Sequence, residues 1–248
     1  MNIAFIPRFL ERRISLDLDE GGKILILYGP RQVGKTTLIN RLISQKPSMK
    51  TLYLTGDDPA DRHDLEGRNG SALARLVAGY DCLVIDEAQR IPGIGLTLKL
   101  LHDTHPELRI VATGSSSFEL ASKTDEPLTG RSRIFILYPI ALAELAELAE
   151  LHDSRELQRS LPDYLVFGMY PEVRMALGRD AKRRALKALT ETYLYKDVIE
   201  FGGIKHANRI HDLLRLLAFQ VGSEVSIAEL ASSLGLSRDT VDRYINIL

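Results

Sequence analysis

The segment 29–37 has the residue types and the spacing that bind phosphate. Gly29 and Gly34 are followed by Lys35 and Thr36 in the pattern GxxxxGKT. The glycines let the backbone curl so that successive N–H groups point into one concavity. Lys35 brings a positive charge to the β- and γ-phosphates, and the Thr36 hydroxyl can ligate Mg²⁺. We predict a nucleotide site with these ligands: Gly29, Pro30, Arg31, Gln32, Val33, Gly34, Lys35, Thr36 and Thr37.

Two adjacent acids, Asp86 and Glu87, follow an apolar segment at 82–85. Downstream of a phosphate-binding loop, an aspartate at the end of a strand can hold Mg²⁺, usually through water. A carboxylate beside it can orient and deprotonate the attacking water. We therefore expect Thr36 and Asp86 at the metal and Glu87 as the catalytic base. The alternative is a pair of solvated acids at a strand end.

Hydroxyl and guanidinium groups near two later strands are further candidates. Ser115 or Thr113 can hydrogen-bond the attacking water or the γ-phosphate, while a hydroxyl-rich turn that caps a helix near Phe118 explains the same residues. Arg131 or Arg133 can reach the γ-phosphate of a neighbouring subunit as an arginine finger, which predicts a homo-oligomer. A surface ion pair is the alternative for these arginines.

Alternating strands and helices must position these residues. Helices are predicted within 1–22, from Gly34 to about Gln45, at 71–78 and at 96–105, with a polar loop at 56–66. The predicted strands are 24–28, 51–55, 81–86, 109–113 and 133–137. This order predicts an α/β fold with a parallel sheet, and the strand context favours a phosphate site over an ordinary glycine turn.

From residue 139 onward the pattern becomes helical. We expect a helix at 141–151, short broken helices at 162–177 and a long helix at 180–200 that Gly202 and Gly203 end. These segments define an α/β core at 1–139 and a helical subdomain at 140–205, in which Arg174 is a candidate lid arginine.

The segment 206–248 has a helix-turn-helix pattern. Ser226 and Glu229 form a capping box, Gly235 turns the chain, and Ser237 caps a last helix. In that helix Val241, Ile245 and Leu248 are expected to be buried. The side chains expected to face outward are Arg238, Asp239, Asp242, Arg243 and Asn246.

Composition narrows the classes of protein. The 248 residues are 45% hydrophobic and 26% charged, which is typical of a globular protein. A net charge of −1 gives no overall attraction to nucleic acid or membrane, so any DNA contact needs a local patch. The single cysteine, Cys82, excludes a disulfide framework and is expected to be a buried, inert thiol. With no apolar run of membrane length and no signal-peptide pattern, we expect a cytoplasmic protein without a membrane partner.

Taken together, these motifs resemble the AAA+ branch of P-loop ATPases, and most closely a prokaryotic group of AAA-domain ATPases related to the archaeal-type ATPases. Members carry GPRQxGKTT, a strand ending in DE, a TGSSS turn, an LxGR segment and LYPLSLxEL. The matching residues here are 29–37, 86–89, 113–117, 128–131 and 137–145. Later family segments, YLxxGGxPEVV, YLxxDI and a helix-turn-helix, are matched at 164–173, 193–199 and 227–248.

The resemblance implies a five-stranded parallel core, a helical lid, a C-terminal winged helix, and ATP with Mg²⁺ as cofactors. Because the sequence stops at Leu248, before the wing and before the further domain that members usually carry, we expect a fragment or a shortened member.

The sequence is compatible with three functions. The first is an ATPase that converts MgATP to ADP and drives a movement between core and lid. The second is a nucleotide-gated switch with little turnover that binds DNA through Arg238–Leu248, or binds a protein. A small-molecule kinase, the third, fits poorly because Asp86 and Glu87 favour the activation of water.

Overall fold

The computed structural model describes residues 6–66, 69–115, 128–148, 154–193 and 207–247. The chain divides into two compact units, Met1–Lys182 and Arg183–Leu248. The boundaries at 139 and 205 expected from the sequence remain a prediction.

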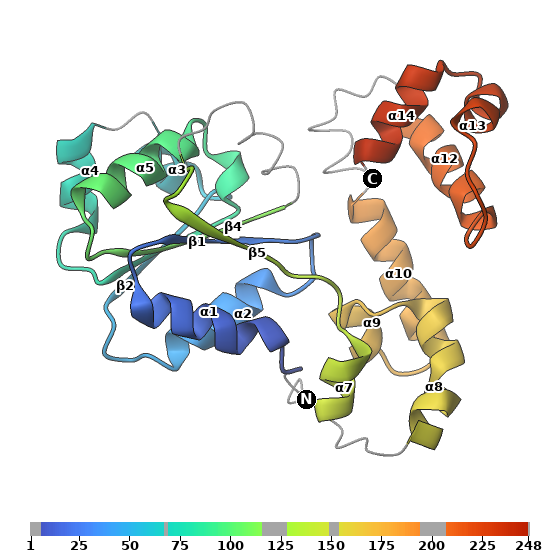
Figure 1. Cartoon of the computed structure of the whole chain (residues 1–248), viewed down its shortest axis with the longest axis horizontal. Helices are drawn as coiled ribbons and strands as arrows, with labels where there is room; N and C mark the ends of the chain where they lie inside the picture. Colours follow the sequence, from blue (N-terminus) through green and yellow to red (C-terminus); the bar gives the residue numbers. More distant parts are fainter. Residues whose placement is uncertain (1–5, 67–68, 116–127, 149–153, 194–206, 248) are drawn as a thin grey trace. The chain divides into compact units, whose positions relative to one another are not determined.

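A five-stranded parallel sheet lies at the centre of the first unit (Figure 1). Its strands are β1 (Ile24–Tyr28), β2 (Thr51–Thr55), β3 (Cys82–Asp86), β4 (Arg109–Gly114) and β5 (Ser132–Ile136), in the order β2-β3-β4-β1-β5. The predicted bounds of all five strands are confirmed to within one residue. Both β1 and β3 are buried along their whole length, as expected for apolar parallel strands with both faces covered.

Helices cover the two faces of this sheet (Figure 1). One layer consists of α1 (Phe9–Glu20) and α2 (Lys35–Ser44), and the other of α3 (Pro59–Leu65), α4 (Gly70–Val77) and α5 (Ile94–Thr104). Alternation along β1 divides the core between them. Leu25 and Leu27 pack with residues of α1 and α2, whereas Ile24 and Ile26 pack with residues of α4 and α5.

The helix α3 corrects the polar loop expected at 56–66. Asp58 caps it, accepting a hydrogen bond from the Ala60 backbone N–H at 2.7 Å, and Pro59 occupies its first turn. Leu65 is its only buried residue, which is why the segment lacks the apolar periodicity of an ordinary amphipathic helix.

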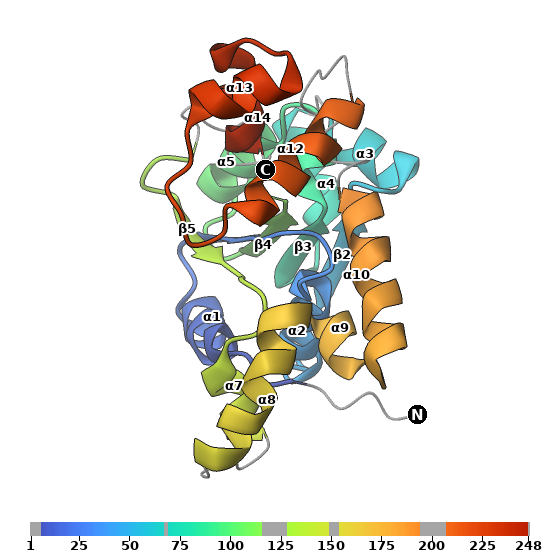
Figure 2. The same cartoon turned by 90° about the vertical axis from the view of Figure 1, so that its right-hand side faces the viewer.

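After β3 the chain forms a short 3₁₀ turn, η1, and after β5 it continues into a series of helices that Figure 2 shows from the side. These elements are η1 (Ala88–Arg90), α7 (Leu142–Leu148), α8 (Ser154–Phe167), α9 (Pro171–Met175) and α10 (Arg179–Tyr193). The short broken helices expected at 162–177 are confirmed in part: α9 is short, but α8 begins earlier, at Ser154, and continues through Pro162. The chain turns at Gly168 and Gly178, which have left-handed φ angles of 71° and 82°. The expected end of the long helix at Gly202 and Gly203 lies outside the described residues.

Besides the end of α10, the described part of the second unit contains a cluster of α12 (Ala207–Phe219), α13 (Ile227–Leu234) and α14 (Arg238–Ile247). Ser226 Oγ accepts from the Glu229 N–H at 3.4 Å, and Ser237 Oγ accepts from the Thr240 N–H at 3.2 Å. Gly235, with φ 62°, joins α13 to α14.

The orientation predicted for α14 is largely confirmed. Val241 is buried and Ile245 is partly buried, but Tyr244, which the sequence left unassigned, is buried as well. The predicted outward residues with described side chains are exposed: Arg238, Asp239, Asp242 and Arg243. The side chains of Asn246 and Leu248 lie outside the described part. Among the described helices, none combines the length and the apolar character needed to cross a membrane.

Candidate nucleotide site

The loop between β1 and α2 has a tightly constrained backbone. A Cβ atom on Gly29 would lie 2.3 Å from the Leu137 carbonyl oxygen, so this position accepts only glycine. Gln32 and Gly34 both have left-handed φ angles, 59° and 102°. These turns bring the chain from the end of β1 to the first turn of α2 and leave the loop's backbone amides at a helix N-terminus, where anions bind.

Lys35 and Thr36, at the start of α2, extend in different directions. Lys35 is buried, and its Nζ donates to the carbonyl oxygens of Gly29 and Pro30 at 2.9 and 3.0 Å. Its ammonium group therefore lies within the loop. Thr36 instead donates from Oγ1 to Oδ2 of Asp86 at 2.8 Å. The structure thus brings the two residues expected at the metal into direct contact.

Asp86 is 8% exposed and accepts four hydrogen bonds. Thr36 and the Tyr53 hydroxyl, at 3.1 Å, donate to Oδ2. Thr113 Oγ1 and the Glu87 backbone N–H, at 3.1 Å, donate to Oδ1. Because β4 lies between β1 and β3, the end of β4 places Thr113 beside Asp86.

The Thr36–Asp86 pair fits a magnesium ion. A hydroxyl oxygen and a carboxylate oxygen 2.8 Å apart are the hard oxygen ligands that Mg²⁺ prefers. Tyr53 supports the same carboxylate. Partial burial, and then the negative charge of Asp86, raise the pKa of the Tyr53 phenol above its ordinary value, so it stays a protonated donor at neutral pH.

Glu87 has a left-handed backbone, with φ 50° and ψ 42°, which is uncommon for a residue with a side chain and recurs at functional sites. Its carboxylate accepts a hydrogen bond from Gln89 Nε2. Within the part of the chain that the structure describes, the other amide atom, Gln89 Oε1, is buried without a hydrogen-bond partner. Glu87 therefore lies next to Asp86, the aspartate expected at the metal, with its side chain held by one amide.

Of the remaining candidates, Ser115 lies at the carboxyl ends of the strands and Arg131 at their amino ends. Ser115 follows β4 directly and is 2% exposed, at the edge where the phosphate-binding loop begins, since Gly114 pairs in register with Tyr28. The helix expected near Phe118, which Ser115 was expected to cap, lies outside the described residues. The role of Ser115 toward water or phosphate stays a prediction.

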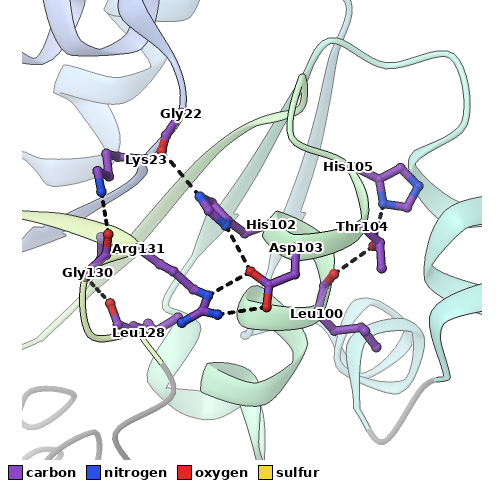
Figure 3. Close-up of polar contacts among 11 residues, drawn as sticks. Gly22, Lys23, Leu100, His102, Asp103, Thr104, His105, Leu128, Gly130 and Arg131 are labelled. Atoms are coloured by element: carbon purple, nitrogen blue, oxygen red, sulfur yellow. Dashed lines mark hydrogen bonds and ion pairs between the residues drawn. The ribbon is translucent and has the colours of Figure 1, made fainter.

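Arg131 lies at the opposite edge, because Ser132 pairs in register with Ile24 at the amino end of β1. Figure 3 shows its guanidinium facing Asp103 of α5, with Nε 2.7 Å from Oδ1 and Nη2 3.1 Å from Oδ2. These hydrogen bonds hold the pKa of Asp103 below its ordinary value. Arg131 is thus outside the site of its own chain, and the ion pair that we considered is present. Arg133 pairs with Asp17.

Sequence reasoning missed several residues of this region. Tyr53 lies two positions before Thr55, which pairs in register with Asp86. This position places Tyr53 near Asp86, but the sequence shows that only once the pairing of β2 with β3 is known. Arg8 and Glu144 lie 136 positions apart and meet behind the loop, and nothing in the sequence links them.

The sheet order, the loop after β1 and the adjacent acids at the end of β3 define a P-loop nucleotide-binding fold. In agreement, residues 21–146 match the family model described as AAA domain, and residues 158–248 match a domain of unknown function, DUF8612. The chain belongs to the AAA-domain family of P-loop ATPases.

Two of the curated relatives, each named as an uncharacterized protein, match most of this chain. MJ1544 of Methanocaldococcus jannaschii is 24% identical over 260 residues, covering 99% of this chain and 58% of the relative. Rv2008c of Mycobacterium tuberculosis is 31% identical over 229 residues, covering 91% of this chain and 47% of the relative. The chain therefore spans about half the length of these relatives.

A solved structure, the Walker-type ATPase PABY2304 of Pyrococcus abyssi, superposes with a TM-score of 0.56 at 18% identity, covering 87% of this chain and 80% of that chain. At this identity the similarity shows a shared fold.

Proposed function

We propose that this chain binds MgATP and hydrolyses it to ADP and phosphate. The observation that supports the proposal best is the contact of Thr36 Oγ1 with Asp86 Oδ2 at 2.8 Å. This contact joins the residues that follow the phosphate-binding loop to the carboxyl end of β3, where the two adjacent acids lie. Glu87 follows Asp86 directly, so a candidate base stands beside the candidate metal ligand.

Each residue has a distinct role in this proposal. Loop amides of 29–37 and the Lys35 ammonium hold the β- and γ-phosphates. Thr36 and Asp86 hold Mg²⁺, which when bound neutralises charge on the phosphate oxygens. Glu87 accepts a proton from the attacking water, and Ser115 at the end of β4 hydrogen-bonds that water or the γ-phosphate.

Hydrolysis in this proposal moves the helices after residue 139 relative to the sheet. Arg131 acts only between subunits, since it lies at the amino edge of its own sheet. A homo-oligomer is therefore part of the proposal, and Arg131 must exchange Asp103 for the γ-phosphate of a neighbour.

Phosphate release from MgATP without any added acceptor tests the proposal. Removing a positioned general base costs about 10²- to 10⁴-fold in rate, so Glu87→Gln is expected to bind ATP and to lose turnover on that scale. Glu107→Gln, an exposed acid in the turn before β4, is the matched control and is expected to keep wild-type turnover. Unchanged turnover in Glu87→Gln would remove Glu87 from the mechanism. Transfer only to an added acceptor would favour a kinase.

A second candidate is a nucleotide-gated DNA-binding switch with little turnover. It is supported by the capped helices α13 and α14 around Gly235 and by exposed Arg238 and Arg243 on α14. Exposed Asp239 and Asp242 on the same helix offset that charge, which fits a protein-docking surface as well. Gel shift across a salt series, with and without nucleotide, decides between them. Absence of DNA binding at low salt would end the DNA hypothesis for this chain.

A further inference from the structure

Arg8 is a buried cation directly behind the phosphate-binding loop. It is the N-cap residue of α1 and is 8% exposed. Its Nη1 donates to the Val33 carbonyl oxygen at 3.1 Å, its Nη2 to the Tyr138 carbonyl oxygen at 2.5 Å, and its Nε to Glu144 Oε2 at 3.1 Å. One guanidinium thus contacts the loop, the chain after β5 and the first turn of α7.

The contact with Val33 fixes a peptide plane of the loop. In a planar trans peptide, the C=O of one residue and the N–H of the next point in opposite directions. Because the Val33 carbonyl points at Arg8, the Gly34 N–H points away from Arg8. A Cβ on Gly34 would lie 3.9 Å from Arg8 Nη1, so the guanidinium is in contact range of this peptide on its outer side. Rotation of the peptide would break the hydrogen bond to Arg8.

Glu144 holds Arg8 in this place. It is buried, and its carboxylate accepts from Arg8 Nε, from the Phe9 backbone N–H at 2.9 Å and from the Ala141 backbone N–H at 2.9 Å. A buried ion pair whose remaining oxygens are hydrogen-bonded has a defined geometry, whereas removal of one partner leaves an uncompensated charge. The Arg8 guanidinium group therefore has little freedom to move away from the Val33 carbonyl oxygen.

We propose that Arg8, anchored by Glu144, is a positioning residue for nucleotide binding: it orients the Val33–Gly34 peptide so that the Gly34 N–H is presented to phosphate. This inference rests on the proposed nucleotide site. It also makes the segment from Tyr138 to Glu144, which leads into the helices, part of the same hydrogen-bonded unit as the loop. Nucleotide affinity and the position of α7 are thereby linked through one side chain.

The test is the ADP and ATP affinity of folded variants, measured by titration calorimetry at low temperature. Arg8→Met is expected to weaken affinity about tenfold, the scale of one charge-assisted hydrogen bond to phosphate. Arg8→Lys, which keeps the charge but cannot contact three acceptors at once, is expected to rescue little. Because Arg8→Met leaves Glu144 buried and unpaired, the double variant Arg8→Met with Glu144→Gln removes both charges and is measured beside it.

Arg41→Met is the matched control. Arg41 on α2 pairs with Glu11 on α1 at 2.7 Å, so its loss also loosens α1 but does not touch the loop. An irreversibly misfolded fraction lowers the binding stoichiometry and leaves the dissociation constant unchanged, whereas reversible unfolding weakens the apparent affinity in proportion to the folded fraction. Each variant is therefore titrated well below its own melting temperature, where the folded fraction is close to one and a change in the dissociation constant reports a positioning effect. Affinity within twofold of wild type in Arg8→Met and in the double variant would overturn this inference and leave the proposed function intact. A wild-type protein that binds neither nucleotide would overturn the proposed function and this inference together.

Discussion

Replacing Asp86 by asparagine or by alanine is expected to have clearly different effects on the stability of the nucleotide-free protein. The carboxylate accepts two donors on each oxygen. On Oδ1 one donor is the backbone N–H of Glu87, which cannot become an acceptor. On Oδ2 both donors are hydroxyls, of Thr36 and Tyr53, and a hydroxyl can rotate to accept. The side chain introduced by Asp86→Asn can therefore keep its oxygen toward Thr113 and Glu87 and turn its amide nitrogen toward the other two.

The magnitudes follow from burial. Asp86→Asn exchanges charged for neutral hydrogen bonds and also removes a buried charge, so we expect a change of no more than about 1 kcal/mol. Asp86→Ala leaves the Thr113 hydroxyl, which is 0% exposed, without its acceptor. That orphaned donor and the lost bond from Glu87 cost about 3 kcal/mol together. The difference of about 2 kcal/mol corresponds to about 4–8 °C in melting temperature for a protein of this size.

Thermal unfolding without nucleotide, followed by far-ultraviolet circular dichroism, measures the melting temperatures of the two variants, and Asp86→Asn is expected to melt above Asp86→Ala. The same two variants are then titrated with ATP in the presence of Mg²⁺ or of a chelator. We expect both to lose the gain in affinity that Mg²⁺ gives the wild-type protein. Asp86→Asn melting below Asp86→Ala would refute the hydrogen-bond assignment. A full Mg²⁺ effect in Asp86→Asn would refute the metal assignment.

Single contacts give three smaller predictions. Tyr53→Phe is expected to lower stability by about 1 kcal/mol or less, since the residue is 39% exposed, and a larger loss in urea unfolding would contradict the role given to its hydroxyl. Burial raises the pKa of the Cys82 thiol to about 12, so labelling by a thiol reagent at pH 8 should be slow until the protein unfolds; fast native labelling would contradict the buried position. Hydrogen bonds from Lys182, and then from Arg174, lower the pKa of Asp163. The stabilisation that Asp163 gives is therefore present above the ordinary carboxyl pKa and is lost as the pH falls through the lowered pKa. The melting temperature of Asp163→Asn should lie below that of the wild-type protein at pH 7 and equal it in acid, and a difference that does not change with pH would refute the ion pairs.

The sequence predicted all five strands of the sheet, most clearly those that are buried on both faces and form continuous apolar runs, as in Ile24–Tyr28 and Cys82–Asp86. It predicted the phosphate loop because chemistry fixes both residue type and spacing there. It missed α3, whose single buried residue, Leu65, leaves no periodicity to detect. Contacts that depend on tertiary packing were also out of reach.

Within the site, the limit of prediction is long-range geometry. Lys35, Thr36 and Asp86 were assigned from local motifs, and the structure brings Thr36 and Asp86 together. Tyr53 and Arg8 act through neighbours that come close only when the strands and α7 have packed. Their residue types carry no signal of their own, since a tyrosine in a strand and an arginine before a helix are ordinary surface residues.

The most direct test of the account is calorimetric titration of MgATP into the wild-type protein and into Lys35→Ala. The Lys35 ammonium lies in the loop, on the Gly29 and Pro30 carbonyl oxygens, where phosphate is expected to bind. We predict saturable binding by the wild-type protein and an affinity lower by about tenfold to a hundredfold in the variant. Equal affinity in the two proteins, or no binding by either, would contradict the account.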